Sequence, residues 1–299
     1  MIPQTTRCGL WTLLCQTAFA GLAASSSGST IVSFDSSKGP ILVRLFDAVT
    51  PNTVDNFLSY AEPGRYDGTF IHRSPPDFVV QGGGFALNGS IFDAESILTD
   101  NDVPIGDEPG LTNVPGTLAP AKNSFGATSQ WYFNIGDNTF LDAQGFSVFG
   151  RTVGGSQTVV QAINSLDLVN ASVAENAPGE DFDELPVKSL AAVQSKGDIN
   201  PEDAVMINAV TVMDFPAGDY NFDGVVSLAD LAVWEVQQGG TLHVGEYIAG
   251  VTPTEMDADG NGDGRVDLAD RAIWQQNVPE PAALLVLAAV APLIGRRRQ

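Results

Sequence analysis

Short β-branched and apolar runs, separated by turn-forming residues, dominate the first two thirds of the chain. The runs Thr30 to Phe34 and Pro40 to Phe46 flank the turn formers Ser36, Ser37 and Gly39, so they predict a first hairpin. Later runs predict further strands at residues 78–81 (FVVQ), 131–135 (WYFNI), 147–153 (SVFGRTV) and 205–213 (VMINAVTVM). Many short strands of this kind predict a mainly β fold, built as a closed antiparallel barrel.

Two segments within this region have helical spacing instead. Thr50 and Pro51 supply a cap and a first-turn proline, and apolar residues at 54, 57 and 58 follow until Pro63 ends the helix. A second helix is predicted at 159–166, with its apolar residues on one face. Residues 167–203 are acidic and lack a clear period, which predicts an extended, solvent-exposed excursion.

After Gly218 the pattern changes to a duplicated unit. The segment GDYNFDGVVSLADLAVW, from Gly218 to Trp234, aligns with ADGNGDGRVDLADRAIW, from Ala258 to Trp274. Each copy predicts an oxygen-rich loop that opens a single helix, over 228–237 in the first copy and 268–276 in the second. The candidate ligands of the first loop are Asp219, Asn221, Asp223, the Val225 carbonyl, Ser227 and Asp230; those of the second are Asp259, Asn261, Asp263, the Arg265 carbonyl, Asp267 and Asp270.

Oxygen ligands at this spacing are typical of loops that bind Ca²⁺, so we expect two structural calcium sites. The alternative is that these side chains only cap helices and form turns, since Ser227 and Asp230 also fit a capping box. A capping box leaves the acids and the amide upstream of it unexplained, in both copies.

Both ends of the chain are typical of targeting segments. Residues 1–24 combine Arg7 with an apolar stretch and small residues near the end, the pattern of a secretory signal peptide. A lipoprotein signal at Cys15 is the alternative. Because Cys8 and Cys15 both lie inside this segment, the exported chain is expected to have no disulfide.

The other end, 278–299, carries Pro279-Glu280-Pro281, an apolar stretch from Ala282 to Ile294 and three arginines. As a helix this stretch spans about 20 Å, less than the roughly 30 Å of a bilayer core. Its arginine flank favours a stop-transfer segment, and a buried core helix is the alternative.

Charge narrows the range of partners. The 299 residues include 36 acidic and 14 basic ones, a net charge of −22, which disfavours a nucleic-acid partner and favours divalent cations. His72 and His243 are the only histidines, so a histidine-based metal site or catalytic triad is not expected.

The candidate catalytic chemistry lies between Phe70 and Gly84, where Arg73 stands among apolar residues. A guanidinium placed beside a core is costly to desolvate unless a polar group meets it, so Arg73 is a candidate site residue. A surface ion pair with an acid such as Asp77 is the alternative.

Four motifs around this arginine resemble successive blocks of cyclophilin-type peptidyl-prolyl isomerases. They are TPNTVDNF with YDGTFIHRSPPDFVVQGG, GTLAPAK, TSQWYFNIGDN and FLDAQGFSVFGRTVGG, and the resemblance covers residues 29–214. It implies an eight-stranded closed barrel capped by a helix at each end, proline-containing polypeptides as substrates and no cofactor for catalysis.

The resemblance also implies roles for particular residues. Arg73 would donate to the prolyl nitrogen, Gln81 would orient it, and the backbone at Ala121 and Lys122 would hold the substrate with Gln130. His72 is interpreted as a hydrogen-bonded structural histidine, with substrate contact as the alternative. The implied proline pocket and its rim comprise Phe78, Val79, Tyr132, Phe140, Leu141 and Phe146, of which Val79, Tyr132, Phe140 and Phe146 depart from common family residues.

The duplicated unit, 217–277, resembles a dockerin type I module, a small α-helical domain with EF-hand-type loops. This implies a cohesin-like partner, although such a module also serves alone for stability or attachment. The end segment resembles a PEP-CTERM sorting signal, which implies a sorting protease and membrane contact through this segment alone.

The sequence therefore predicts an exported isomerase of the cell envelope, cell surface or medium, which assists the folding of secreted or envelope proteins. The alternatives are a non-catalytic protein that binds proline-containing segments, and a calcium-dependent adhesion or scaffold protein.

Overall fold

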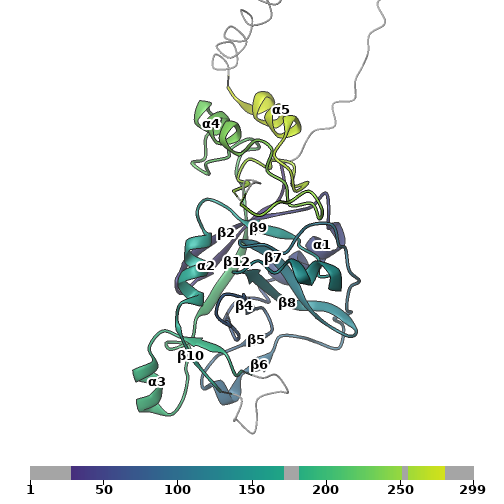
Figure 1. Cartoon of the computed structure of the whole chain (residues 1–299). Coiled ribbons are helices and arrows are strands. Elements are labelled where there is room, and N and C mark those ends of the chain that lie inside the picture. The colour runs from purple at the N-terminus through teal and green to yellow at the C-terminus, as the bar shows by residue number, and fades with distance from the viewer. Residues whose placement is uncertain (1–27, 172–181, 251–254, 280–299) are drawn as a thin grey trace, which may run out of the picture.

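One antiparallel sheet forms the larger part of the computed structural model, which describes residues 28–171, 182–250 and 255–279. The sheet is strongly curled (Figure 1) and runs in the order β4-β8-β7-β9-β2-β1-β12-β3-β5-β6. Its strands are β1 (Ile31–Ser36), β2 (Gly39–Leu45), β3 (Thr69–Phe70), β4 (Val79–Gly82), β5 (Phe85–Ala86), β6 (Glu95–Ser96), β7 (Thr117–Asn123), β8 (Gly126–Asn134), β9 (Gly150–Thr152) and β12 (Met206–Met213).

The predicted closed, eight-stranded barrel is corrected in two respects, because the sheet is a strongly curled half-barrel with β4 and β6 at its ends and its strand number differs. The sheet has ten strands among the described residues, because the short strands β5 and β6 extend it beyond β3. Only an isolated bridge between Arg73 and Gln81 links the chain after β3 to β4 at the other end of the sheet. That bridge lies at the predicted catalytic arginine.

The two predicted helices of this region are present. They are α1 (Pro51–Ala61) and α2 (Gln157–Asn164), and two 3-10 turns, η1 (Ile91–Asp93) and η2 (Thr139–Gln144), accompany them. Inside the curled sheet Phe34 contacts three aromatic rings, with centroids 5.8 Å away for Phe57, 4.9 Å for Trp131 and 5.5 Å for Phe133. The contacts with Trp131 and Phe133 are edge-to-face, which adds to the stabilisation from burial.

Residues 167–203 were predicted to form a solvent-exposed excursion. In the part of this segment that the structure describes, that prediction is wrong. Strands β10 (Asp167–Val169) and β11 (Leu185–Val187) pair there, and α3 (Leu190–Lys196) follows. Phe182 and Leu185 are fully buried with Phe70 and Phe85 in a separate apolar cluster. The apolar residues among these acids follow no helical or strand period, so the sequence pattern did not predict their burial. They pack in one cluster with Phe70 of β3.

The duplicated unit folds as a pair of related loops and helices, here called the repeat module (described residues 217–250 and 255–277). Its helices, α4 (Leu228–Gln237) and α5 (Leu268–Asn277), begin where they were predicted, and each has a capping box. The two copies exchange hydrogen bonds: Trp234 Nε1 donates to the Asp267 carbonyl (2.7 Å) and Trp274 Nε1 to the Ser227 carbonyl (2.6 Å).

The repeat module packs against one end of the curled sheet, with α3 at the other end (Figure 1). Thr112 donates its backbone N–H to Leu242 (2.8 Å) and Val244 donates to Gly110 (3.0 Å), so two short chain segments pair across the boundary. One buried apolar cluster joins Leu111 and Val114 to Trp234 and Trp274. The two parts therefore share a core rather than only a linker.

Within the described residues no helix is long and apolar enough to cross a membrane. The predicted signal peptide and the apolar end segment lie almost wholly outside the described residues.

Candidate active site

A groove of about 190 Å³ opens on the curled sheet where β4, β7 and β8 lie side by side. All the side chains that line it belong to the set predicted from the sequence: Arg73, Phe78, Val79, Gln81, Ala121, Lys122, Tyr132, Leu141 and Phe146. The groove thus places one guanidinium beside an aromatic and aliphatic floor.

Arg73 stands at the polar end of this groove. Its Nε lies 3.1 Å from Glu184 Oε2, and both side chains are about one third exposed, at 33% and 32%. The guanidinium carbon also lies 5.7 Å from the centre of the Phe78 ring. The ion pair expected as the alternative does exist, but its partner is Glu184 and not Asp77. Because the contact is made through Nε, the terminal nitrogens of the fork remain for a substrate.

Gln81 supports Arg73 through its backbone, whereas its side chain pairs with Gln130. Its N–H donates to the Arg73 carbonyl (2.8 Å), while its side-chain Nε2 donates to Gln130 Oε1 (2.8 Å). Gly84 makes room for this amide pair, since a Cβ there would lie 2.8 Å from Gln130 Nε2. Gln130 therefore borders the groove as the partner of Gln81.

Tyr132 forms the floor and is fixed from below. Its hydroxyl donates to Asn113 Oδ1 (3.0 Å), and its ring meets that of Phe146 at 69° with centroids 6.0 Å apart. Burial raises the pKa of Tyr132 far above its usual value, with Asp142 adding to the shift, so the hydroxyl stays protonated. Asn113 itself donates to Asp142 (2.8 Å). A chain of hydrogen bonds from Tyr132 through Asn113 to Asp142 therefore fixes the position of the floor.

Phe78 and Phe140 form one rim of the groove. Their rings stack at 18° with centroids 6.0 Å apart, and Phe140 is 55% exposed. The preceding residue, Asp77, has a positive φ of 57°, a strained conformation for a residue with a Cβ. This turn is held by Asn164, whose Nδ2 donates to the Pro75 carbonyl (2.9 Å).

The charge of Lys122 is directed away from the substrate path. Its Nζ lies 2.6 Å from Asp107 Oδ2 and 4.7 Å from the centre of the Phe146 ring. Its side chain therefore supports the wall of the groove, and the backbone at Ala121 and Lys122 is what a substrate chain would meet.

His72 lies outside the groove. Its ring is buried against Phe70, Phe85 and Phe182, with the Phe85 centroid 5.3 Å away, and neither ring nitrogen has a hydrogen-bond partner in the described part of the chain. Burial lowers the pKa of His72 to about 4, and the charge of Arg73 adds to that shift, so the ring is neutral. The Gln130 side chain and the Phe70 backbone lie near enough to raise the pKa of the ring as weaker hydrogen-bond partners, so the structural role and the hydrogen bonding of His72 stay predictions.

The loops of the repeat module bury acidic side chains in two matching arrangements. Asp219 accepts backbone N–H groups from Asp223 (3.2 Å) and Gly224 (2.8 Å), and Asp259 does the same in the second copy, at 3.2 Å and 2.9 Å. Asp230 and Asp270, in the first turns of α4 and α5, likewise accept backbone N–H groups of their own loops.

Asp219, Asp230, Asp259 and Asp270 are at most 2% exposed, and none forms an ion pair with Lys or Arg among the described residues. Burial raises the pKa of Asp259 well above its usual value and that of Asp270 to about 6. Across the described residues, no three His, Cys, Asp or Glu side chains gather in a way that could hold a metal ion.

Comparison with known proteins identifies the family. Residues 31–181 match the family model described as "Cyclophilin type peptidyl-prolyl cis-trans isomerase/CLD". The chain belongs to the cyclophilin family. The chain is 37% identical over 175 residues to peptidyl-prolyl cis-trans isomerase A of Dickeya dadantii, which covers 56% of this chain and 88% of the relative.

Two further matches have lower identity. Peptidyl-prolyl cis-trans isomerase B of Escherichia coli K12 is 32% identical over 160 residues, covering 50% of this chain and 94% of the relative. A solved cyclophilin of Cryptosporidium parvum superposes with a TM-score of 0.44 at 18% identity, covering 64% of this chain and 100% of that one.

As a cyclophilin-type peptidyl-prolyl cis-trans isomerase, the chain catalyses rotation about X-Pro bonds. That rotation is slow because it breaks amide resonance, with a barrier of about 18–20 kcal/mol. The groove needs no nucleophile or base. The family resemblance implies that its apolar floor would seat the proline ring and that Arg73 would donate to the prolyl nitrogen, whose lone pair becomes available only when the amide twists. A donor that bonds best to the twisted state lowers the barrier.

Some supporting residues were not predicted. Glu184, Asn113 and Asn164 hold Arg73, Tyr132 and the turn before Phe78, respectively. Glu184 lies 111 positions after Arg73 in an acidic stretch, where nothing local distinguishes it from its neighbours. Only the fold brings it to the groove.

Proposed function

We propose that this cyclophilin is exported and catalyses X-Pro rotation in the folding of secreted or envelope proteins. The observation that carries the catalytic part is the placement of Arg73 beside an apolar groove floored by Tyr132 and Leu141. The competing function is a protein that binds proline-containing segments without turning them over. The Arg73–Glu184 ion pair favours it, because Glu184 engages the Nε edge of the guanidinium and neutralises part of the charge that catalysis needs.

Arg73→Ala separates the two functions. Loss of a hydrogen bond made best to the twisted amide should lower turnover about 10²–10³-fold, equivalent to roughly 3–4 kcal/mol. Arg73→Lys should restore little, because lysine lacks the planar fork. Turnover is measured with a protease-coupled assay on X-Pro peptides, and binding of the same peptides by calorimetry. Arg271→Ala, in the repeat module, is the matched control. Equal turnover in Arg73→Ala and wild type would favour the binding function.

The repeat module is the part to which we assign calcium. The dockerin-like spacing supports this proposal. So does the burial of Asp219, Asp230, Asp259 and Asp270, none of which forms an ion pair with Lys or Arg in the part of the chain that the structure describes. A buried carboxylate is costly unless it is neutralised, and a hard cation with oxygen ligands is the group these residue types suit. The residues proposed to hold the ions are those predicted from the sequence, including the amides of Asn221 and Asn261.

Calcium titration of the full-length chain tests this assignment. Calorimetry should give two sites, and removal of calcium with a chelator should lower the melting temperature and the helix signal. The double variant Asp219→Asn with Asp259→Asn should lose both responses and retain isomerase activity. A chain that melts at the same temperature with and without the chelator would show that these acids serve only as caps and turns.

The proposal that the protein is exported rests on the signal-peptide pattern of residues 1–24 and the sorting-signal pattern of residues 278–299. We expect native material to begin at Gly21 or Ser25 and to lack residues 282–299, because a signal peptide and a sorting segment are both removed. Mass spectrometry of protein from the producing cell checks this. A cytoplasmic chain that retains Met1 would contradict it.

A cohesin-like domain is the proposed partner of the repeat module, and a pull-down with calcium and with chelator is its test.

A further inference from the structure

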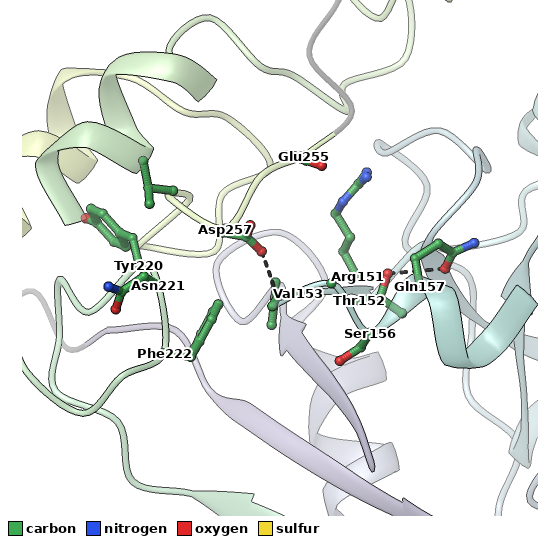
Figure 2. Close-up of a pocket in the computed structure, with 13 residues that line it drawn as sticks. Arg151, Thr152, Val153, Ser156, Gln157, Tyr220, Asn221, Phe222, Glu255 and Asp257 are labelled. Atoms are coloured by element: carbon green, nitrogen blue, oxygen red, sulfur yellow. Dashed lines mark hydrogen bonds between the residues drawn. The ribbon is translucent and has the colours of Figure 1, made fainter. Parts of the chain in front are cut away.

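A cavity of about 390 Å³ lies away from the groove, between the curled sheet and the repeat module. We call it the seam cavity. Its sheet side is the end of β9 and the turn into α2, residues 151–157, and its module side includes Phe222, Val233, Glu255 and Asp257. Figure 2 shows Arg151 and Gln157 on one side, with Asp257 and Glu255 on the other. This volume is within the range of small-molecule sites.

Arg151 lines the seam cavity and lacks a hydrogen-bond acceptor for part of its guanidinium. It is only 6% exposed, and its Nη1 is buried without a hydrogen-bond partner in the described part of the chain. Arg44, the neighbouring strand residue, differs at its terminal nitrogens: its Nη1 donates to Ser29 Oγ and its Nη2 to the Asp257 carbonyl (2.8 Å), and only its Nε is buried without a partner in the described residues. Buried donors in native proteins nearly always have partners, so Arg151 lacks an acceptor that something else supplies.

A second donor on the same wall is also unpaired. Gln157 uses its Oε1 to accept from Thr152 (3.3 Å), but its Nε2 is buried and has no partner among the described residues. Burial lowers the pKa of Arg151 to about 10 while Asp257 and other acids oppose the shift, so the guanidinium is charged at neutral pH. A carboxylate matches this wall, because it accepts from a guanidinium fork and from an amide at once.

The module wall has the opposite charge. Asp257 is already engaged, with its Oδ1 accepting the Gly154 N–H (2.9 Å), whereas Glu255 is exposed and has no hydrogen-bond partner in the described residues. Two carboxylates and a net charge of −22 make this a poor place for a dianion such as phosphate. A molecule with a carboxylate at one end and an ammonium at the other meets both walls.

Apolar surface lies between the charged walls. Val153, Phe222 and Val233 line the cavity together, and Phe222 is held in a strained conformation with a φ of 60°. We propose that the seam cavity binds a free α-amino acid with an apolar side chain, whose carboxylate meets Arg151 and Gln157 and whose ammonium meets Glu255.

Calorimetry on the full-length protein with calcium present tests this site, with L-leucine and L-phenylalanine as probes. At least one probe should bind, and its N-acetyl and amide forms should bind at least about 10-fold more weakly, because each removes one charge. Arg151→Met and Glu255→Gln should weaken binding by a similar factor. Arg271→Met and Glu235→Gln, the same substitutions on residues outside the cavity, should not.

Three results would overturn the proposal. The first is no binding of either amino acid at millimolar concentration, in which case the cavity holds only water. The second is equal binding of the blocked forms, and the third is inorganic phosphate binding as tightly as the amino acids. The blocked probes need no variant, so they decide the matter even if Arg151→Met fails to fold. None of these outcomes depends on isomerase activity.

Discussion

Glu184 offers a sharp test of how the groove works. If it positions Arg73 by holding Nε, then Glu184→Gln should lower kcat/KM. Two unit charges 3.1 Å apart attract strongly, but both side chains are about one third exposed, so water screens the pair. Exposed ion pairs contribute about 0.2–1 kcal/mol, which corresponds to a decrease of roughly 1.4- to 5-fold in rate.

The assay is protease-coupled turnover at low and high salt. High salt should shrink the difference between Glu184→Gln and wild type, because it screens an exposed pair. Glu202→Gln breaks a comparable exposed pair with Lys196, far from the groove, and should leave turnover unchanged. A faster Glu184→Gln enzyme would refute positioning and show that Glu184 competes with the substrate for Arg73.

Other substitutions test the supports of the fold and the groove. His72 has a folded-state pKa of about 4, below its ordinary 6.5, so the unfolded chain binds more protons than the folded chain between these pH values. The free energy of unfolding should therefore fall by about 3 kcal/mol as the pH drops from about 6.5 to 4. Thermal melts across that range should show this loss in wild type, and His72→Phe should abolish it. Gly84→Ala should displace Gln130 from Gln81 and lower kcat/KM about 2- to 10-fold, with little change in the melting temperature; unchanged kinetics would show that the amide pair is dispensable. Trp274→Phe leaves the Ser227 carbonyl without its donor and should cost about 1–3 kcal/mol of stability while turnover stays constant; Trp234→Phe, its counterpart in the other copy, should cost a similar amount, and unequal losses would contradict the symmetry of the module.

The groove residues were predictable because they sit on short motifs. Phe78, Val79 and Gln81 share one strand run, and Tyr132 lies in another, so the family resemblance of these motifs is enough to predict that they line one groove. Strand β7 was less evident from its pattern, since Pro120 cannot donate to a ladder; the structure accommodates it at a register shift between Pro120 and Lys122.

The supports were not predictable, because each depends on contacts between distant segments. Phe182 and Leu185 pack on β3 from within an acidic stretch, and Glu184 between them turns toward Arg73. Likewise, the repeat was visible in the sequence, but its docking on Leu111 was not: the Gly110–Thr112 segment has no pattern that marks it as a partner of the chain around His243.

That docking has a mechanical consequence. A catalytic domain on a flexible linker would rotate freely about its point of attachment, so its groove would have no fixed orientation. Here the pairing of Gly110 and Thr112 with Val244 and Leu242 locks the two parts, and Asn113, the next residue, holds Tyr132 in the floor of the groove. A partner that binds the repeat module therefore also fixes the orientation of the groove relative to that partner, and with it the direction from which a substrate polypeptide can enter.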